Sequence, residues 1–106
     1  MESPRVALRA EPDGVWVVVC SGEFDQDTTG KVAAACGGEA ADARLLVLDV
    51  TGVTFADSSF LNVLIRLRNA RPVVLAGPLP RQLERLLEMT GVLALFTIRD
   101  GQPPAA

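Results

Sequence analysis

Three short apolar runs constrain the fold of this chain more than any other feature. They are Val15–Cys20, Leu45–Val50 and Val73–Ala76. Each run is rich in valine or leucine and too short for a typical buried helix, so we interpret each as a strand. The run Leu45–Val50, which is apolar except for Asp49, is typical of a strand that is buried on both faces. The stretches between the runs are long enough for helices, and this alternation favours an α/β fold with a mainly parallel sheet.

A β-hairpin is predicted at the N-terminus, with strands near residues 5–10 and 15–21. Between them, Pro12-Asp13-Gly14 is a turn signal, because proline presets φ and glycine tolerates positive φ. The first of these strands would run antiparallel at one edge of the sheet. A last strand is predicted over Leu93–Ile98.

Three helices are expected between these strands. The first centres on Lys31–Cys36 and ends at Gly37-Gly38. The second starts at Asp57-Ser58-Ser59, runs to about Ala70 and stops before Pro72, with a narrow polar stripe formed by Asn62, Arg66 and Asn69. The third begins at Pro80 and ends before Gly91, and its apolar face consists of Leu79, Leu83, Leu86 and Leu87.

The chain has 106 residues, which fits one domain over residues 1–100, followed by a tail, 101–106, that we expect to fray. No apolar segment is long enough to cross a bilayer or act as a leader, so we expect a soluble, cytoplasmic protein without membrane contact. The net charge of -3 argues against direct nucleic-acid binding. The basic residues Arg66, Arg68 and Arg71 are interpreted as the solvated side of a helix.

The residue types that catalysis usually needs are scarce. The sequence has no histidine and no tyrosine, so a Ser-His-Asp or Cys-His catalytic set is excluded, and we expect a protein that is not an enzyme and has no small-molecule substrate. Cys20 and Cys36 belong to no metal-binding motif and are expected to be reduced, partly buried thiols. No metal and no cofactor are therefore predicted.

The junction at Asp57-Ser58-Ser59 combines a strand exit with a helix start. The first N–H groups of a helix lack intrahelical partners and carry partial positive charge. A serine there could cap the helix, or it could carry a phosphate that these groups stabilise. Local chemistry by itself favours capping.

The wider sequence resembles a known family. The segment D-V-T-G-V-T-F-A-D-S-S-F-L, ending at Leu61, is similar to the signature D-L-S-G-V-x-F-x-D-S-S-G-L of STAS domains in anti-sigma factor antagonists. Gly22-Glu23-Phe24-Asp25 resembles the G-E-L-D of that family, and residues 81–96 resemble its third helix and the following strand. The resemblance extends from Val6 to Ile98 and implies a single STAS-like domain with three to four helices.

The resemblance also implies a function. It would make Ser58 the acceptor of a phosphate from a partner, an anti-sigma factor of the serine-kinase type. Asp57 and Ser59 would shape the site, and Asp25 would lie in a neighbouring loop that meets the kinase. The unphosphorylated chain would bind the kinase and release its sigma factor, and phosphorylation would switch binding off. Other STAS domains imply an alternative, a binding subunit of a stress-signalling assembly or of a lipid-transport complex.

Two positions depart from the family signature. Phe60 and Asn62 stand where the family usually has glycine. Glycine lets a partner backbone approach closely, which Phe60 would prevent. Phe60 either turns into the core or stays exposed as an anchor for the partner, since aromatic residues are favoured at binding hot spots. Both positions are candidates for the partner-binding surface.

Overall fold

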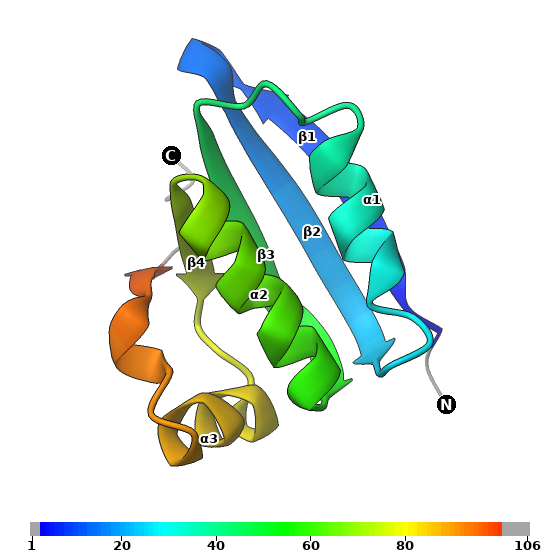
Figure 1. Cartoon of the computed structure of the whole chain (residues 1–106), viewed down its shortest axis with the longest axis vertical. Coiled ribbons are helices and arrows are strands. Elements are labelled where there is room, and N and C mark those ends of the chain that lie inside the picture. The colour runs from blue at the N-terminus through cyan, green and yellow to red at the C-terminus, as the bar shows by residue number, and fades with distance from the viewer. Residues whose placement is uncertain (1–2, 101–106) are drawn as a thin grey trace.

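The apolar runs form the central strands of one sheet. In the computed structural model, which describes residues 3–100, the strands are β1 Arg5–Glu11, β2 Val15–Phe24, β3 Leu45–Ala56, β4 Val73–Gly77 and β5 Thr97–Asp100. They lie in the order β1-β2-β3-β4-β5, with β1 antiparallel to β2 and the remaining neighbours parallel (Figure 1). The predicted α/β class, with a hairpin at the edge of a mainly parallel sheet, is confirmed.

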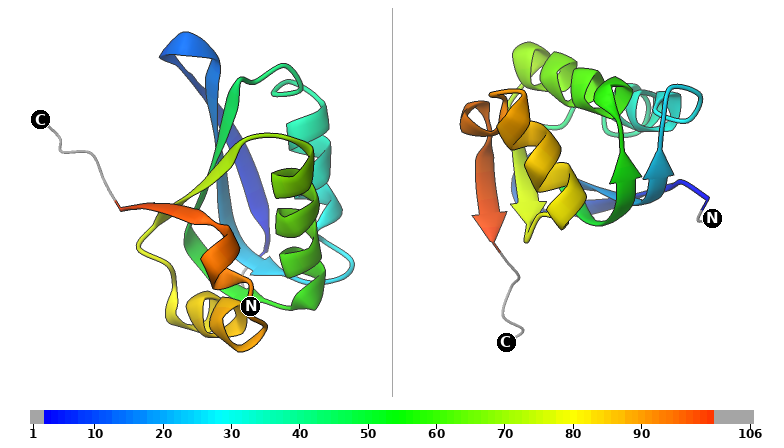
Figure 2. Two further views of the ribbon diagram at one scale, coloured as in Figure 1. Left: turned by 60° about the vertical axis from the view of Figure 1, so that its left-hand side comes forward. Right: turned by 90° about the horizontal axis from the view of Figure 1, so that it is seen from below.

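Three α-helices accompany the sheet, in agreement with the predicted number. They are α1 Gly30–Gly37, α2 Ser58–Ala70 and α3 Arg81–Met89. The helices α1 and α2 lie side by side on one face of the sheet, and α3 lies near the end at which β2 and β3 finish (Figure 2). This arrangement leaves the start of α2 next to the carboxyl ends of the two central strands.

The main core lies between the sheet and the two parallel-lying helices. Leu46 and Leu48 of β3 are fully buried and belong to one cluster with Val32 of α1 and Leu64 of α2. Val47 points to the opposite face of the sheet and is also fully buried. The centre of β3 is therefore buried on both faces, as its continuous apolar sequence predicts.

The central strands are longer than their apolar runs suggest. The sequence predicts that the second central strand ends at Val50, yet residues 51–56 continue β3 and pair with the second half of β2 up to Phe24. The pairing shifts register twice, and near the first shift the carboxylate of Asp49 accepts hydrogen bonds from the amide of Thr51 at 3.0 Å and its hydroxyl at 2.7 Å. Such irregularities break the alternating pattern by which a strand is identified, so the predicted end of this strand at Val50 was wrong.

The predicted last strand is displaced along the chain. Gly91 ends α3 with a φ of 76°, and Leu93–Leu95 form a short 3₁₀ turn. Hydrogen bonds from Leu95 N to Val92 O and from Phe96 N to Leu93 O close this turn before β5 begins at Thr97. Leu93 of this turn packs against the core, whereas Leu95 is exposed. The predicted fraying of residues 101–106 falls outside the described residues.

Candidate functional site

Two acidic residues that the sequence singles out follow neighbouring strand ends. Phe24 ends β2, Ala56 ends β3, and these two residues are paired across the sheet. Asp25 and Asp57 come directly after them. Because parallel strands place their carboxyl ends at the same edge, the structure brings the two predicted segments together.

Asp57 is the residue that caps α2 at the Asp57-Ser58-Ser59 junction. Its backbone is extended, and its carboxylate accepts a hydrogen bond of 2.8 Å from the amide of Ser59. Its carbonyl oxygen accepts from the amides of Phe60 and Leu61 at 3.1 and 3.2 Å. The first turn of α2 is thus held by Asp57, in the usual manner of an N-cap residue.

Ser58 is the first residue of α2, and it is exposed. Within residues 3–100 we find no hydrogen bond made by its hydroxyl group. Ser59 is half-buried, so the two adjacent serines differ in their access to another molecule. The side chain that carries a hydroxyl to the surface at the helix start is therefore that of Ser58.

The loop after β2 is stabilised by its own polar groups. The carboxylate of Asp25 accepts hydrogen bonds from the amide of Asp27 and from the hydroxyl of Thr28, both at 3.0 Å. The hydroxyl oxygen of Thr28 in turn accepts from the amide of Asp25 at 2.9 Å. Asp25 is exposed, so it belongs to the surface of this edge while fixing the turn that leads into α1.

Phe60 takes the first of its two predicted positions. Its side chain is fully buried, and its ring lies against that of Phe24. Phe60 is therefore not available as a contact of a partner, and its assignment to the binding surface was wrong, because the core extends beneath the first turn of α2. Asn62 is exposed, as its place in the polar stripe predicts.

Gln82 was missed by the sequence analysis. Its side-chain amide reaches from α3 to the end of β3, where Oε1 accepts from the amide of Ala56 at 2.9 Å. Its Nε2 donates to the carbonyl oxygen of Ala56 at 2.8 Å. A glutamine in the first turn of a helix carries no sequence signal for such a contact, which depends on how α3 packs.

A search of protein families adds an independent finding. Residues 7–97 match the family model described as Mlab, STAS domain. The chain belongs to the STAS-domain family. Among curated proteins, no significant match is found for this STAS domain.

Solved structures with this fold include named regulators. An anti-sigma factor antagonist from Mycobacterium paratuberculosis is 30% identical, with a TM-score of 0.76, and the match covers 92% of this STAS domain and 86% of that chain. The unphosphorylated anti-sigma factor antagonist SpoIIAA is 20% identical, with a TM-score of 0.65 and coverage of 92% and 90%. RsbS from Moorella thermoacetica, solved as a variant, is 24% identical, with a TM-score of 0.64 and coverage of 92% and 88%. This STAS domain therefore shares its family with anti-sigma factor antagonists.

Both thiols of the STAS domain are buried and unpaired with each other. Burial raises the pKa of Cys20 to about 12, and the neighbouring Cys36 and Asp49 add to this rise. Burial also raises the pKa of Cys36, although the guanidinium of Arg71 opposes the shift. Neither cysteine forms the thiolate that a nucleophile requires at neutral pH.

In the described part of the chain, no group of three or more His, Cys, Asp or Glu residues is placed to hold a metal ion.

Two basic residues, Arg68 of α2 and Arg71 directly after it, make more hydrogen bonds within the fold than the sequence suggests. The guanidinium of Arg71 donates to the carbonyl oxygens of Cys36, Ala40, Ala41 and Ala43 at 2.8 to 3.3 Å. Arg68 donates to the carbonyl oxygen of Leu95 at 2.8 Å. Arg68 and Arg71, which the sequence assigns to a solvated cluster, therefore connect α2 to neighbouring segments of the fold.

The helices in residues 3–100 lack the combination of length and apolar character that spanning a membrane requires.

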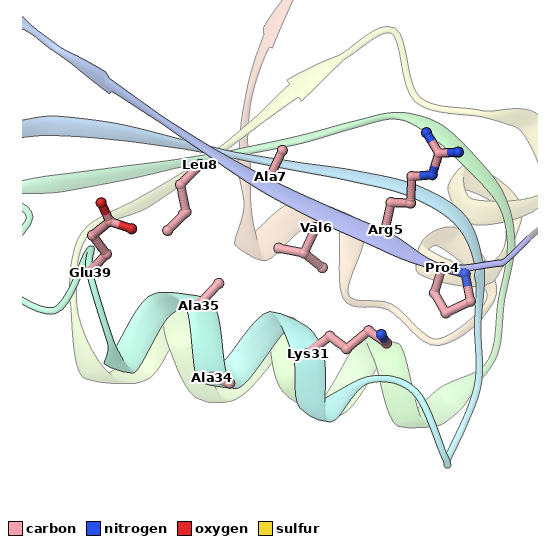
Figure 3. Close-up of a pocket in the computed structure, with 9 residues that line it drawn as sticks. All are labelled: Pro4, Arg5, Val6, Ala7, Leu8, Lys31, Ala34, Ala35 and Glu39. Carbon is pink, nitrogen blue, oxygen red and sulfur yellow. The ribbon is translucent and has the colours of Figure 1, made fainter.

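A groove of about 910 Å³ lies between β1 and α1 of the STAS domain. Val6 and Leu8 of β1 point toward α1, whereas Arg5 points away, as Figure 3 shows. Lys31 and Glu39 contribute charged groups to the rim. The groove contains none of the site residues that the sequence predicts.

Proposed function

We propose that this STAS domain is an anti-sigma factor antagonist whose binding of a serine-kinase anti-sigma factor is controlled by phosphorylation of Ser58. The observation that carries the proposal is that Asp57 and Ser58 have different roles at the start of α2. Asp57 caps the helix, and the exposed hydroxyl of Ser58 takes no part in the capping. The ordinary structural role of a serine at this place is thus already filled by its neighbour.

The binding surface is the edge at which β2 and β3 end. It comprises Ser58, the loop at Asp25 and the exposed side of α2 at Asn62, with Ser59 at its margin. In the unmodified state this surface docks on the anti-sigma factor and displaces the sigma factor. Membership of the same family as the mycobacterial anti-sigma factor antagonist supports this partner. SpoIIAA, which shares the fold, has been solved in unphosphorylated and phosphorylated forms.

A phosphate on Ser58 would oppose docking through its charge. It adds about -1.5 to -2 charges at neutral pH, next to the carboxylate of Asp57. The partial positive charge at the start of α2 favours the dianion in solution, so no change of fold is needed. Burying it against a partner without a matching cation costs several kcal/mol. A loss of about 3 kcal/mol weakens binding more than a hundredfold.

The STAS domain acts in this proposal as a binding module and phosphate acceptor, and the kinase supplies the catalysis. The proposal is tested by incubating the protein with a panel of purified kinase-type anti-sigma factors and Mg-ATP, followed by mass mapping of phosphate. We expect one phosphate on Ser58, retained in Ser59→Ala and absent in Ser58→Ala. Stoichiometric phosphorylation of Ser58→Ala would exclude the assignment.

The alternative function keeps the fold and changes the partner. A subunit of a lipid-transport complex would co-purify with a transporter ATPase, and one of a stress-signalling assembly would co-purify with a large complex. An affinity-tagged chain expressed at native level separates these outcomes from capture of a kinase-type anti-sigma factor. Capture of the ATPase together with an absence of phosphate on Ser58 would replace the proposal with this alternative.

A further inference from the structure

Within residues 3–100, the end of β3 has a strand partner on one side only. On the β4 side, pairing stops at Asp49, which faces Ala76. The strand nevertheless continues to Ala56, which is paired with Phe24 on the β2 side. On the open side, the amide of the Gln82 side chain both accepts from and donates to the backbone of Ala56. Gln82 thus takes the place of a neighbouring strand for one residue.

This contact is well placed to control the acceptor segment. Ala56 directly precedes the capping residue Asp57 and stands two positions before Ser58. The helix that carries Gln82 is anchored by Leu83 and Leu87, which are both fully buried. The anchored helix therefore holds the point from which the first turn of α2 departs.

We propose that Gln82 is a positioning residue for phosphoryl transfer to Ser58, an inference that rests on the proposed function. In the transfer, the Ser58 Oγ atom forms a bond to the γ-phosphorus of ATP and the bond from that phosphorus to the β,γ-bridging oxygen breaks. The hydroxyl proton passes to a base of the kinase, and ADP leaves. Reacting atoms must be held close to the productive geometry, and a misplacement of about 1 Å can cost on the order of a hundredfold in rate. Gln82 limits such misplacement through Ala56.

Two substitutions separate the parts of the contact. Gln82→Met keeps the length of the side chain and removes both hydrogen bonds. Gln82→Glu keeps an oxygen that accepts from the amide of Ala56, but at neutral pH it offers no donor to the carbonyl. Arg85→Met on the same helix is the matched control, because Arg85 is exposed and, within residues 3–100, the hydrogen bonds from α3 to Ala56 come from Gln82.

The kinetic test uses radiolabelled Mg-ATP and the kinase-type anti-sigma factor that phosphorylates the native chain. With the STAS domain as varied substrate, Gln82→Met is expected to lower kcat by about tenfold and to change KM by less than about twofold. Gln82→Glu should fall between Gln82→Met and the native chain, and Arg85→Met should match the native chain. An unchanged kcat in Gln82→Met would overturn the inference while leaving the proposed function intact.

A second measurement does not depend on the kinase. Amide hydrogen exchange followed by NMR should show faster exchange at Ala56 in Gln82→Met, and protection largely kept in Gln82→Glu. Relaxation of the Ser58 amide should report greater motion in Gln82→Met. If no kinase phosphorylates the native chain, the proposed function fails, whereas unaltered exchange and relaxation in Gln82→Met refute the positioning role itself. Should Gln82→Met not fold, Gln82→Glu decides through its own kcat and its Ser58 relaxation.

Discussion

The rings of Phe24 and Phe60 lie with their centroids 5.1 Å apart and their planes inclined by 32°. Phe24 immediately precedes Asp25, and Phe60 follows Ser58 by two positions. Both rings are fully buried, so their contact connects the Asp25 loop and the start of α2 through the core. The spacing lies in the range in which aromatic pairs attract each other beyond simple burial.

Shortening Phe60 should therefore destabilise the protein strongly. Phe60→Ala is expected to lower the free energy of unfolding by about 3–5 kcal/mol, because it leaves a cavity beside Phe24. Urea unfolding followed by the fluorescence of Trp16 measures this change. Phe55→Ala is the matched control, since Phe55 is 43% exposed and should cost less than half as much. Similar losses in the two variants would contradict the buried position of Phe60.

The capping role of Asp57 leads to a second prediction. Asp57→Ala should lower the free energy of unfolding by about 1 kcal/mol, because the amide of Ser59 loses its acceptor, whereas Asp57→Asn should retain most of the stability. Ser58→Ala should leave the unfolding midpoint nearly unchanged. If Ser58→Ala were as destabilising as Asp57→Ala, the serine would share the cap, and the argument for an unused hydroxyl would fail.

Arg71 provides a third prediction about stability. Its guanidinium satisfies carbonyl oxygens in and after the last turn of α1, so Arg71→Met should lower the free energy of unfolding by about 1–3 kcal/mol. Arg66→Met on the exposed side of α2 should change it by less than about 0.5 kcal/mol. Chemical denaturation of both variants under identical salt conditions makes the comparison. Equal stability of the two variants would show that the carbonyl contacts contribute nothing.

Much of this fold can be predicted because its elements carry local signals. The strand Leu45–Val50, the helix stop before Pro72 and the αL conformation of Gly91 each follow from residues close in sequence. The continuation of β3 to Ala56 does not, because it depends on pairing with β2 and on two register shifts. A strand that lacks regular alternation can be identified only when its partner is known.

The candidate site shows the same limit. The sequence identifies Asp25, Asp57 and Ser58 because a family signature marks them, and the register of β2 and β3 brings their segments together. The contacts of Gln82 with Ala56 and of Arg71 with the end of α1 join residues 26 to 35 positions apart. Such contacts depend on helix packing, which no local pattern encodes. The burial of Phe60, in contrast, was one of two open alternatives that only the structure decides.

The buried thiols predict how stability depends on alkaline pH. Burial raises the pKa of Cys20 from 9.0 to about 12. The unfolded chain therefore releases the thiol proton above pH 9 while the folded chain keeps it, so stability falls as pH rises between these values, by at most about 1.4 kcal/mol per pH unit for one proton. Urea unfolding from pH 7 to 11 measures this slope, and the absence of tyrosine simplifies its interpretation. Cys20→Ala should flatten the curve, and an unchanged slope would refute the assignment to Cys20.

A negative charge at Ser58 should weaken binding to the anti-sigma factor, and the same charge elsewhere on the surface should not. Ser58→Glu places a single negative charge at the start of α2 and should weaken binding to the kinase-type anti-sigma factor, though less than a phosphate does. Thr97→Glu adds the same charge at an exposed position on β5, away from the ends of β2 and β3, and should bind like the native chain. Titration calorimetry of both variants checks this difference. Equal weakening would indicate a general charge effect instead of a local one.

The most direct measurement compares the dissociation constants of the native STAS domain and of the same protein phosphorylated stoichiometrically on Ser58. Both are titrated calorimetrically into the kinase-type anti-sigma factor that performs the phosphorylation, with ADP present so that no further transfer takes place. We predict that the phosphorylated form binds at least a hundredfold more weakly, which corresponds to about 3 kcal/mol. Equal dissociation constants for the two forms would contradict the switch at Ser58.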